Sequence, residues 1–260
     1  MSADRLAGKV AIVTAVSGGI GQAIFKDVAA TALGVVSSSR GSKETFWDGG
    51  DWPGNAIHVI GDMTCEADIE NLFKQAMALH GRVDVAINCV GGSLFGHKIE
   101  DFPADEFDKV VATNLRSAFL FTKHAIRAMK GNCPGGGNIV HVVSISAKKI
   151  AINKAPYGIA KAGLARLIHY AAQEAAEHDI LVNGISPGYV FTPRHEKEID
   201  EKATRTGKPR ERIADGLVSG QLIKRYLLPA DLLDAVHLLS TTRVMTGQVI
   251  NVDCGEVLSY

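Results

Sequence analysis

The chain has 260 residues, of which 46% are hydrophobic and 22% are charged, and its 28 Lys and Arg balance its 28 Asp and Glu. A formal net charge of zero gives no overall field to attract nucleic acid or an anionic membrane, and the length suits one large α/β domain. Cys65, Cys89, Cys133 and Cys254 show no CxxC spacing, and the sequence shows no signal peptide and no membrane span. We therefore expect a reduced, cytoplasmic protein without a nucleic-acid or membrane partner.

In chain order, short β-type runs alternate with longer runs of helical periodicity. Strands are predicted at residues 9–14, 35–38, 56–60, 83–88, 138–144, 180–185 and 248–252. Helices are predicted at residues 20–33, 66–80, 104–129, 157–178 and 229–240. Residues 41–55 are interpreted as a loop enclosing a short helical turn, and residues 194–222 as a charged, weakly patterned stretch. This alternation predicts a doubly wound Rossmann domain spanning residues 1–260, with a seven-stranded parallel sheet.

The first strand is followed by the glycine-rich sequence TAVSGGIG at residues 14–21, which opens the first helix. Such a loop lets the backbone approach a pyrophosphate, and the helix N-terminus supplies unpaired N–H groups and a positive dipole end. On its own the pattern also fits an ordinary tight turn. Its place after the first strand of a βαβ unit favours a dinucleotide site.

The loop resembles the TGxxxGxG motif of the classical short-chain dehydrogenase/reductase family, with Ser17, Gly19, Ile20 and Gly21 as implied coenzyme contacts. Ala15 stands where the family usually has its first Gly. Alanine fits there if the φ angle is negative, so we expect only a modest perturbation of binding.

The resemblance continues along most of the chain. Asp62 and Met63 match the family's adenine contacts, and Asn88 and Gly91 match the first and last residues of its NNAG motif, which line the adenosine ribose. Residues 183–192 resemble N-x-I-x-P-G-x-V-x-T, which implies nicotinamide contacts; they include Pro187, Gly188, Val190 and Thr192.

Tyr157 and Lys161 form the family's YxxxK motif, and four residues apart they share one helix face. A nearby ammonium favours the phenolate and should lower the tyrosine pKa from about 10, which suits acid–base catalysis. By resemblance, Lys161 also holds the nicotinamide ribose together with Tyr157, Ser144 polarises the substrate carbonyl, and Asn114 holds a water that links Lys161 to solvent. An alternative role for Asn114 is a polar residue that relieves a helix kink.

These residues imply reversible oxidation of a secondary alcohol to a ketone by hydride transfer, with NADP or NAD as coenzyme. The alternative function is that of a binding or regulatory protein, which has the same fold but catalyses no reaction. No metal site is expected, because the histidines form no HExxH motif.

The family resemblance also implies a substrate lid at residues 193–225 and a homotetramer built through the helices at 104–129 and 157–178 and the last strand. Ser146, Tyr189 and His195 are candidate substrate contacts, although His195 also fits a solvated loop residue.

The coenzyme preference should depend on the end of the second strand, which meets the adenosine 2′ position. No acidic residue stands there; Ser39 can donate to a phosphate and Arg40 can pair with one. NADP is therefore expected ahead of NAD, unless the 41–55 loop brings Glu44 or Asp48 close.

Overall fold

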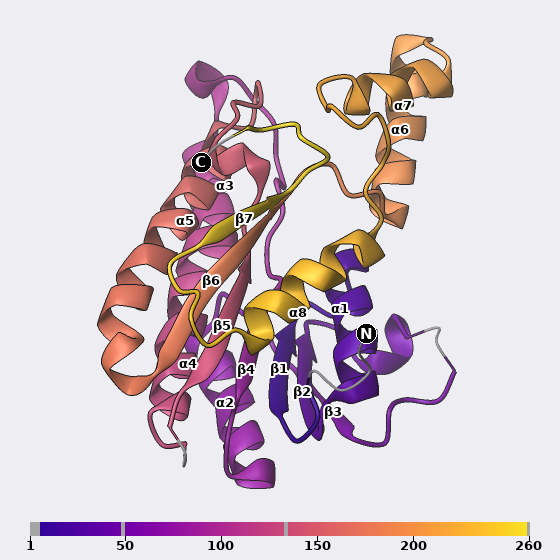
Figure 1. The fold of residues 1–260 in the computed structure, drawn as a ribbon. Coiled ribbons are helices and arrows are strands. Elements are labelled where there is room, and N and C mark those ends of the chain that lie inside the picture. Colours follow the sequence, from indigo (N-terminus) through magenta and orange to yellow (C-terminus); the bar gives the residue numbers. More distant parts are fainter. Residues whose placement is uncertain (1–5, 48–49, 133–134, 259–260) are drawn as a thin grey trace.

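The computed structural model describes residues 6–47, 50–132 and 135–258. A single parallel sheet runs through the protein (Figure 1). Its strands lie in the order β3-β2-β1-β4-β5-β6-β7. The strands are β1 (Val10–Thr14), β2 (Gly34–Ser39), β3 (Ala56–Ile60), β4 (Val85–Asn88), β5 (Gly137–Val142), β6 (Ile180–Pro187) and β7 (Val249–Val252). The expected doubly wound fold with seven parallel strands is confirmed.

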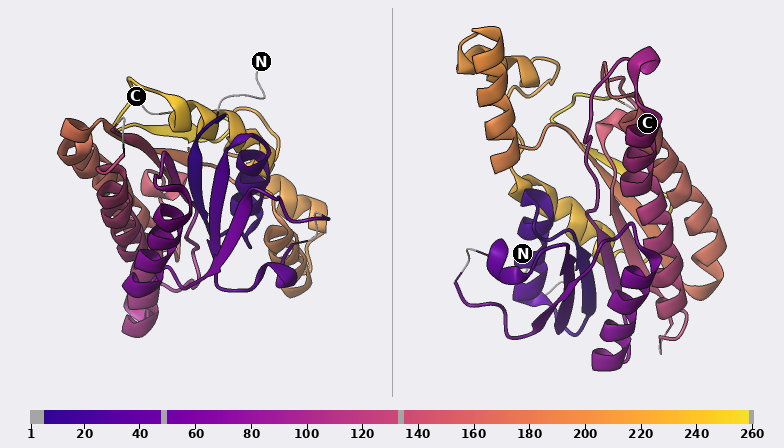
Figure 2. Two further views of the ribbon diagram at one scale, coloured as in Figure 1. Left: turned by 90° about the horizontal axis from the view of Figure 1, so that it is seen from below. Right: turned by 180° about the vertical axis from the view of Figure 1, so that it is seen from behind.

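Helices cover both faces of this sheet (Figure 2). The α-helices are α1 (Gly19–Thr31), α2 (Glu66–His80), α3 (Ala104–Val111), α4 (Ser117–Met129), α5 (Ala155–Ala175), α6 (Pro193–Thr206), α7 (Arg210–Val218) and α8 (Leu233–Thr241). The apolar faces of α2, α4 and α5 pack on one side of the sheet, and those of α1 and α8 pack on the other. All five residues of β1 are buried, as expected for a strand that is covered on both faces.

The helix predicted over 104–129 is divided in the structure. Between α3 and α4 the backbone makes a π-helical segment, Ala112–Arg116, with Asn114 inside it. An apolar period does not reveal a change from i→i+4 to i→i+5 hydrogen bonding, which is why the pattern predicted one regular helix.

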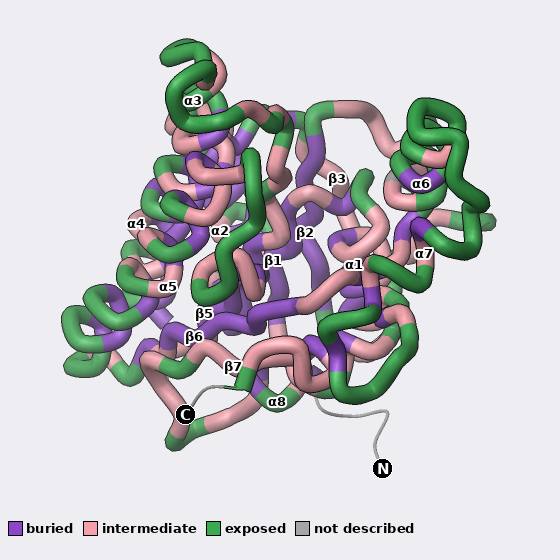
Figure 3. The backbone as a smooth tube through the Cα atoms, turned by 90° about the horizontal axis from the view of Figure 1, so that it is seen from above, coloured by how far each residue is buried: buried purple, intermediate pink, exposed green. Residues whose placement is uncertain are grey.

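The stretch at 194–222, predicted as weakly patterned, holds the two helices α6 and α7. They project from the rest of the fold, and their residues are largely exposed (Figures 1 and 3). Few of their side chains are buried; Ile199, Ile213 and Val218 are among these. Residues 194–206 contain only Ile199 and Ala203 as apolar residues, so their composition did not indicate a helix that packs on the core.

Because the strands are parallel, their carboxyl ends meet at one edge of the sheet. The strand order reverses between β1 and β4, and in open α/β sheets ligands bind outside the carboxyl ends at such a switch point. The glycine-rich loop and Ser144 follow strands at this edge, Asn88 ends β4, and residues 187–192 begin at the last residue of β6.

Candidate active site

Ser144, Tyr157 and Lys161 come from two adjoining elements. Ser144 follows β5, is 9% exposed, and its Oγ accepts a hydrogen bond from the Ser146 amide at 3.1 Å. Tyr157 lies in the first turn of α5, and Lys161 lies one turn later with its Nζ 5.8 Å from the centroid of the tyrosine ring. The YxxxK spacing thus places the phenol and the ammonium on one helix face, as predicted.

The Lys161 side chain enters the interior of the protein, where only 2% of the residue is exposed. Its Nζ donates to the carbonyl of Val142, the last residue of β5, at 2.8 Å. Burial lowers the pKa of this ammonium to about 8, opposed by the neighbouring Cys89 thiol, whose own pKa burial raises to about 12. Lys161 therefore remains mainly protonated at neutral pH, but it would titrate far more easily than a surface lysine.

Asn114 is fully buried and joins two elements. Its Nδ2 donates to the carbonyls of Val110 and Gly92, and its Oδ1 accepts from the Gly92 amide at 3.0 Å. A Cβ on Gly91 would lie 2.8 Å from both Asn114 Oδ1 and Lys161 Nζ, so the loop after β4, the π segment and α5 meet here. The bonds to Val110 and Gly92 support the alternative role, a side chain that satisfies the backbone where the helix departs from α geometry.

The glycine-rich loop fits the close approach of an anionic group. A Cβ on Gly21 would lie 2.3 Å from the Ala15 carbonyl oxygen, so only glycine fits at this position in the first turn of α1. The N-terminus of α1 has no side-chain cap and no acidic residue in its first turn, which leaves its amides for a pyrophosphate.

Ala15 does not meet the condition under which alanine was expected to fit. Its φ angle is +59°, in the left-handed region that favours glycine. The loop keeps the glycine-type turn with an alanine, at a cost in backbone strain.

The start of α6 packs against this loop. A Cβ on Gly19 would lie 2.8 Å from Thr192 Cγ2. Thr192 Oγ1 and His195 Nδ1 are 2.8 Å apart, and the rings of His195 and Tyr189 have centroids 4.6 Å apart. His195 is thus held in this cluster rather than solvated in a loop.

Several predicted coenzyme contacts turn their side chains into the protein. Val190 is 3% exposed and Met63 is 5% exposed, each in an apolar core cluster, so any coenzyme contact of theirs would involve the backbone. Asp62 is exposed, but its Oδ1 accepts from the amide and hydroxyl of Thr64, which closes a local turn before α2 and does not cap the helix.

Asn88 likewise belongs to a buried hydrogen-bond chain that the sequence motifs did not reveal. Its Oδ1 accepts from Thr14 Oγ1 at 2.9 Å, and its Nδ2 lies 3.3 Å from Nδ1 of the fully buried His141. His141 Nε2 lies 3.0 Å from Thr122 Oγ1, which donates to the Ala118 carbonyl. Burial lowers the pKa of His141 to about 3, so this imidazole stays neutral. The one feature of the sequence that could have indicated this chain is His141, a polar residue between two valines in a predicted strand.

At the end of β2 the two predicted 2′ contacts differ. Ser39 is 4% exposed, and its Oγ donates to the Gly41 carbonyl at 2.9 Å, so this hydroxyl is committed within the protein. Arg40 is exposed, and it makes no hydrogen bond or ion pair among the described residues. Of the pair, Arg40 has the side chain available to a ligand.

The fold, the glycine-rich loop at its switch point and the Ser-Tyr-Lys arrangement together define a nicotinamide-dependent oxidoreductase that acts on CH–OH groups. Residues 14–256 match the family model described as enoyl-(acyl carrier protein) reductase. Dehydrogenase/reductase SDR family member 4 of Bos taurus is 34% identical over 83% of this chain and 81% of its own length. The D-beta-hydroxybutyrate dehydrogenase of Rhizobium meliloti is 32% identical over 84% of this chain and 86% of its own length. The chain therefore belongs to the short-chain dehydrogenase/reductase family.

A solved structure shows the same fold. The aldohexose dehydrogenase of Thermoplasma acidophilum superposes with a TM-score of 0.84 over 96% of this chain and 94% of its own, at 24% identity. The two curated relatives carry the names of oxidoreductases, which favours the catalytic interpretation, interconversion of an alcohol and a ketone, over the silent one. No helix among the described residues is long and apolar enough to cross a membrane.

Proposed function

We propose that Tyr157 exchanges a proton with the oxygen of a small polar alcohol or ketone, while Ser144 hydrogen-bonds that oxygen and Lys161 keeps the phenolate form accessible. The bound nicotinamide would supply the hydride chemistry. The observation that carries this proposal is the buried Lys161 ammonium, anchored on Val142 one helical turn from Tyr157. A cation held in a dry site acts on the phenol more strongly than one in water.

The coenzyme that we propose is NADP, with Arg40 as the residue that recognises the 2′-phosphate. The support is the exposed Arg40 at the end of β2, where the sequence has no acidic residue to repel a phosphate. Asp48, one of the two acidic candidates in the following loop, lies outside the described residues. Glu44 belongs to the same loop, but hydrogen bonds to its own backbone amide and to Ser42 lower its pKa, and its carboxylate faces His58.

The test is the ratio of kcat/KM for NADP and NAD in the wild type and in Arg40→Ala. A charge-assisted contact is worth about 1.5–3 kcal/mol, so the substitution should reduce the NADP preference by roughly ten- to a hundredfold. Arg243→Ala, which removes an exposed arginine elsewhere, is the control. A wild type that favours NAD, or a ratio that Arg40→Ala leaves unchanged, contradicts the assignment.

The substrate class is proposed from the mouth of the site. Lys154 precedes Tyr157 by three residues, and its Nζ lies 3.3 Å from Ser93 Oγ and 3.2 Å from the Phe95 carbonyl. Together with the predicted substrate contacts Ser146, Tyr189 and His195, Lys154 is the basis on which we propose a polar substrate. A panel of short hydroxy acids, sugars and cyclic alcohols, followed at the nicotinamide absorbance band, tests it; the relatives named D-beta-hydroxybutyrate dehydrogenase make that acid the first choice.

We also propose that residues 193–225 act as a substrate lid. Their helices α6 and α7 project from the body, while Thr192 at their start lies against Gly19. Replacing residues 194–222 by a short linker should change substrate selectivity more than coenzyme affinity. An equal loss of both would identify the segment as scaffold.

A homotetramer is proposed from the outer faces of α4 and α5. Phe119, Ile159 and Tyr170 are 53%, 57% and 63% exposed there, whereas Phe121 is buried in the core. Large exposed apolar side chains gathered on packed helices are typical of subunit contacts. The mass in solution, measured by light scattering for the wild type and for Phe119→Glu, tests this assembly.

The proposed compartment is the cytoplasm. Cys65, Cys89 and Cys254 are free thiols, and burial raises the pKa of the Cys89 thiol to about 12, so it is not a reactive thiolate. Free thiols of this kind fit a reducing environment. Fluorescence microscopy of the tagged full-length chain would check the assignment.

A further inference from the structure

A histidine on the edge strand reaches the turn that carries Arg40. His58 lies in β3, and its Nε2 is 2.9 Å from the Gly41 carbonyl and 3.2 Å from Ser39 Oγ. Its Nδ1 is 3.0 Å from Ser37 Oγ in β2. One imidazole therefore contacts residues on both sides of Arg40 and the strand that leads to it.

The chemistry of these partners sets the proton positions on the ring. A carbonyl only accepts, so Nε2 must carry the proton that is donated to Gly41. In the neutral ring Nδ1 then accepts from the Ser37 hydroxyl. When the ring is protonated, Nδ1 donates to Ser37, whose hydroxyl can donate to the Ile57 carbonyl at 3.0 Å. Both charge states of His58 can thus keep the turn in place.

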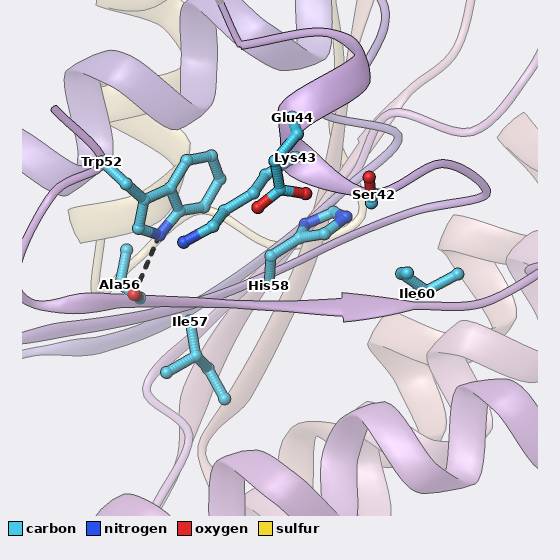
Figure 4. A pocket seen from close by; sticks show the side chains of 8 residues that line it. All are labelled: Ser42, Lys43, Glu44, Trp52, Ala56, Ile57, His58 and Ile60. Atoms are coloured by element: carbon cyan, nitrogen blue, oxygen red, sulfur yellow. Dashed lines mark hydrogen bonds between the residues drawn. The ribbon is translucent and has the colours of Figure 1, made fainter. Parts of the chain in front are cut away.

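The surroundings of His58 are aromatic and carry one charge of each sign. Its ring centroid lies 5.3 Å from that of Phe46 and 5.8 Å from that of Trp52. Figure 4 shows the ring rising from β3 toward the turn with Lys43 and Glu44, while Ile57 points to the other side of the strand. His58, Trp52, Lys43 and Glu44 are among the residues that line an open pocket of about 300 Å³.

The ionisation of His58 follows from this environment. Burial lowers the pKa of the imidazole, the Gly41 carbonyl and Glu44 oppose that shift, and Lys43 adds to it. The ring is therefore neutral at physiological pH and gains its charge only below the ordinary histidine range.

We propose that His58 is a specificity-determining positioning residue, which holds the turn at residues 39–41 so that Arg40 faces the coenzyme 2′ position. The inference rests on the proposed function, because it assigns a second residue to the same 2′ subsite. Ser39 cannot perform the task alone, since its hydroxyl donates its proton to Gly41 within the turn itself. His58 ties that closed turn to the sheet.

A charge on His58 should also distinguish the two coenzymes. A protonated ring beside the turn attracts the 2′-phosphate of NADP but has no matching group in NAD. NADP should therefore gain affinity relative to NAD as the pH falls through the His58 pKa. The phosphate itself has a pKa of about 6 and titrates in the same range, so a variant without the imidazole must supply the baseline.

The experiment compares the dissociation constants of NADP and NAD, by fluorescence titration between pH 5 and 8, in the wild type, His58→Gln and His58→Leu. Glutamine can donate to Gly41 but does not titrate, whereas leucine makes no hydrogen bond. The Leu variant should lose about three- to tenfold of the NADP preference at pH 8, the loss of one neutral hydrogen bond. The Gln variant should keep the NADP preference at pH 8. As the pH falls, its NADP preference should change only as the titration of the 2′-phosphate requires, without the additional increase expected for the wild type.

His169→Gln, on the exposed side of α5, controls for the substitution itself. The proposal is overturned if the Leu variant keeps the wild-type ratio of NADP to NAD affinity, or if the Gln variant keeps the wild-type dependence of that ratio on pH. It is also overturned if a variant loses affinity for both coenzymes equally, which would indicate a purely structural role. Wild-type protein that binds neither coenzyme contradicts the proposed function as well, so the two failures are distinguishable.

Discussion

The catalytic and adenosine ends of this site differ in how their polar side chains are held. At the catalytic end, Lys161 and Asn114 are almost completely buried and each is hydrogen-bonded to main-chain carbonyls. At the adenosine end, Arg40 and Asp62 are exposed, while Ser39 and Met63 point into the protein.

The difference shows what determines a site residue's position. A buried polar group without a partner costs about 1–3 kcal/mol, so burial leaves Lys161 and Asn114 few alternatives. Arg40 has no such constraint, and its placement depends on the turn behind it. Disrupting the catalytic end should therefore remove chemistry, whereas changes at the adenosine end should adjust preference and stability.

The largest effect is expected for Tyr157→Phe. The ring still packs on α5 but carries no transferable proton, so turnover should fall at least about a hundredfold while coenzyme affinity stays nearly unchanged. Stopped-flow rates and coenzyme titrations would measure both. Tyr170→Phe, which removes a hydroxyl from the exposed side of the same helix, is the control. Turnover above about a hundredth of the wild type would exclude the acid–base role.

Lys161→Met should damage turnover and coenzyme affinity together, each by roughly ten- to a hundredfold, because one ammonium is proposed to serve the phenol and the ribose. Methionine keeps most of the buried volume, so packing is little disturbed. Lys74→Met on the surface of α2 is the matched control. An unchanged affinity for coenzyme would remove the ribose contact from the scheme.

The buried chain through His141 predicts that the fold loses stability in acid. The folded-state pKa is about 3 against an ordinary value of 6.5, so the unfolded chain takes up the proton first. This contribution to the free energy of unfolding is intact above pH 6.5 and is lost as the pH falls toward 3; it amounts to about 2 kcal/mol between pH 6.5 and 5. Urea unfolding of the wild type and His141→Gln at both pH values would measure it. Equal acid slopes for the two proteins would show that His141 does not carry the effect.

The smallest effect is expected at the adenosine end, for Ala15→Gly. Glycine relieves the strain of a +59° φ angle but adds freedom to the unfolded chain, so we expect a net stabilisation of about 0.5–1 kcal/mol. Ala30→Gly, inside α1, should instead destabilise by about 1 kcal/mol. Thermal unfolding compares them, and a destabilised Ala15→Gly would mean that the alanine side chain contributes to the loop.

Much of the fold could be predicted from periodicity. The predicted bounds of β3 and α2 match the structure, and the other strands differ by a few residues at their ends. Strand-type runs and the 3.6-residue period of α2 reflect which side chains must leave water, and that information is local. The helices α6 and α7 were not predicted, because they are mostly polar and bury little apolar surface.

The sequence by itself determined the order of the elements and the motif that sets Tyr157 and Lys161 on one helix face, because spacing along a regular element sets the direction of each side chain. Only the tertiary structure decided which polar groups turn inward. It placed Asn114 in a π segment and joined Asn88 to His141. At the end of β2 it bonded the Ser39 hydroxyl to Gly41 and brought His58 from β3 to the turn beside Arg40. The physical reason is that a hydrogen bond depends on which strands and loops become neighbours, and no local pattern of hydrophobicity encodes that neighbour.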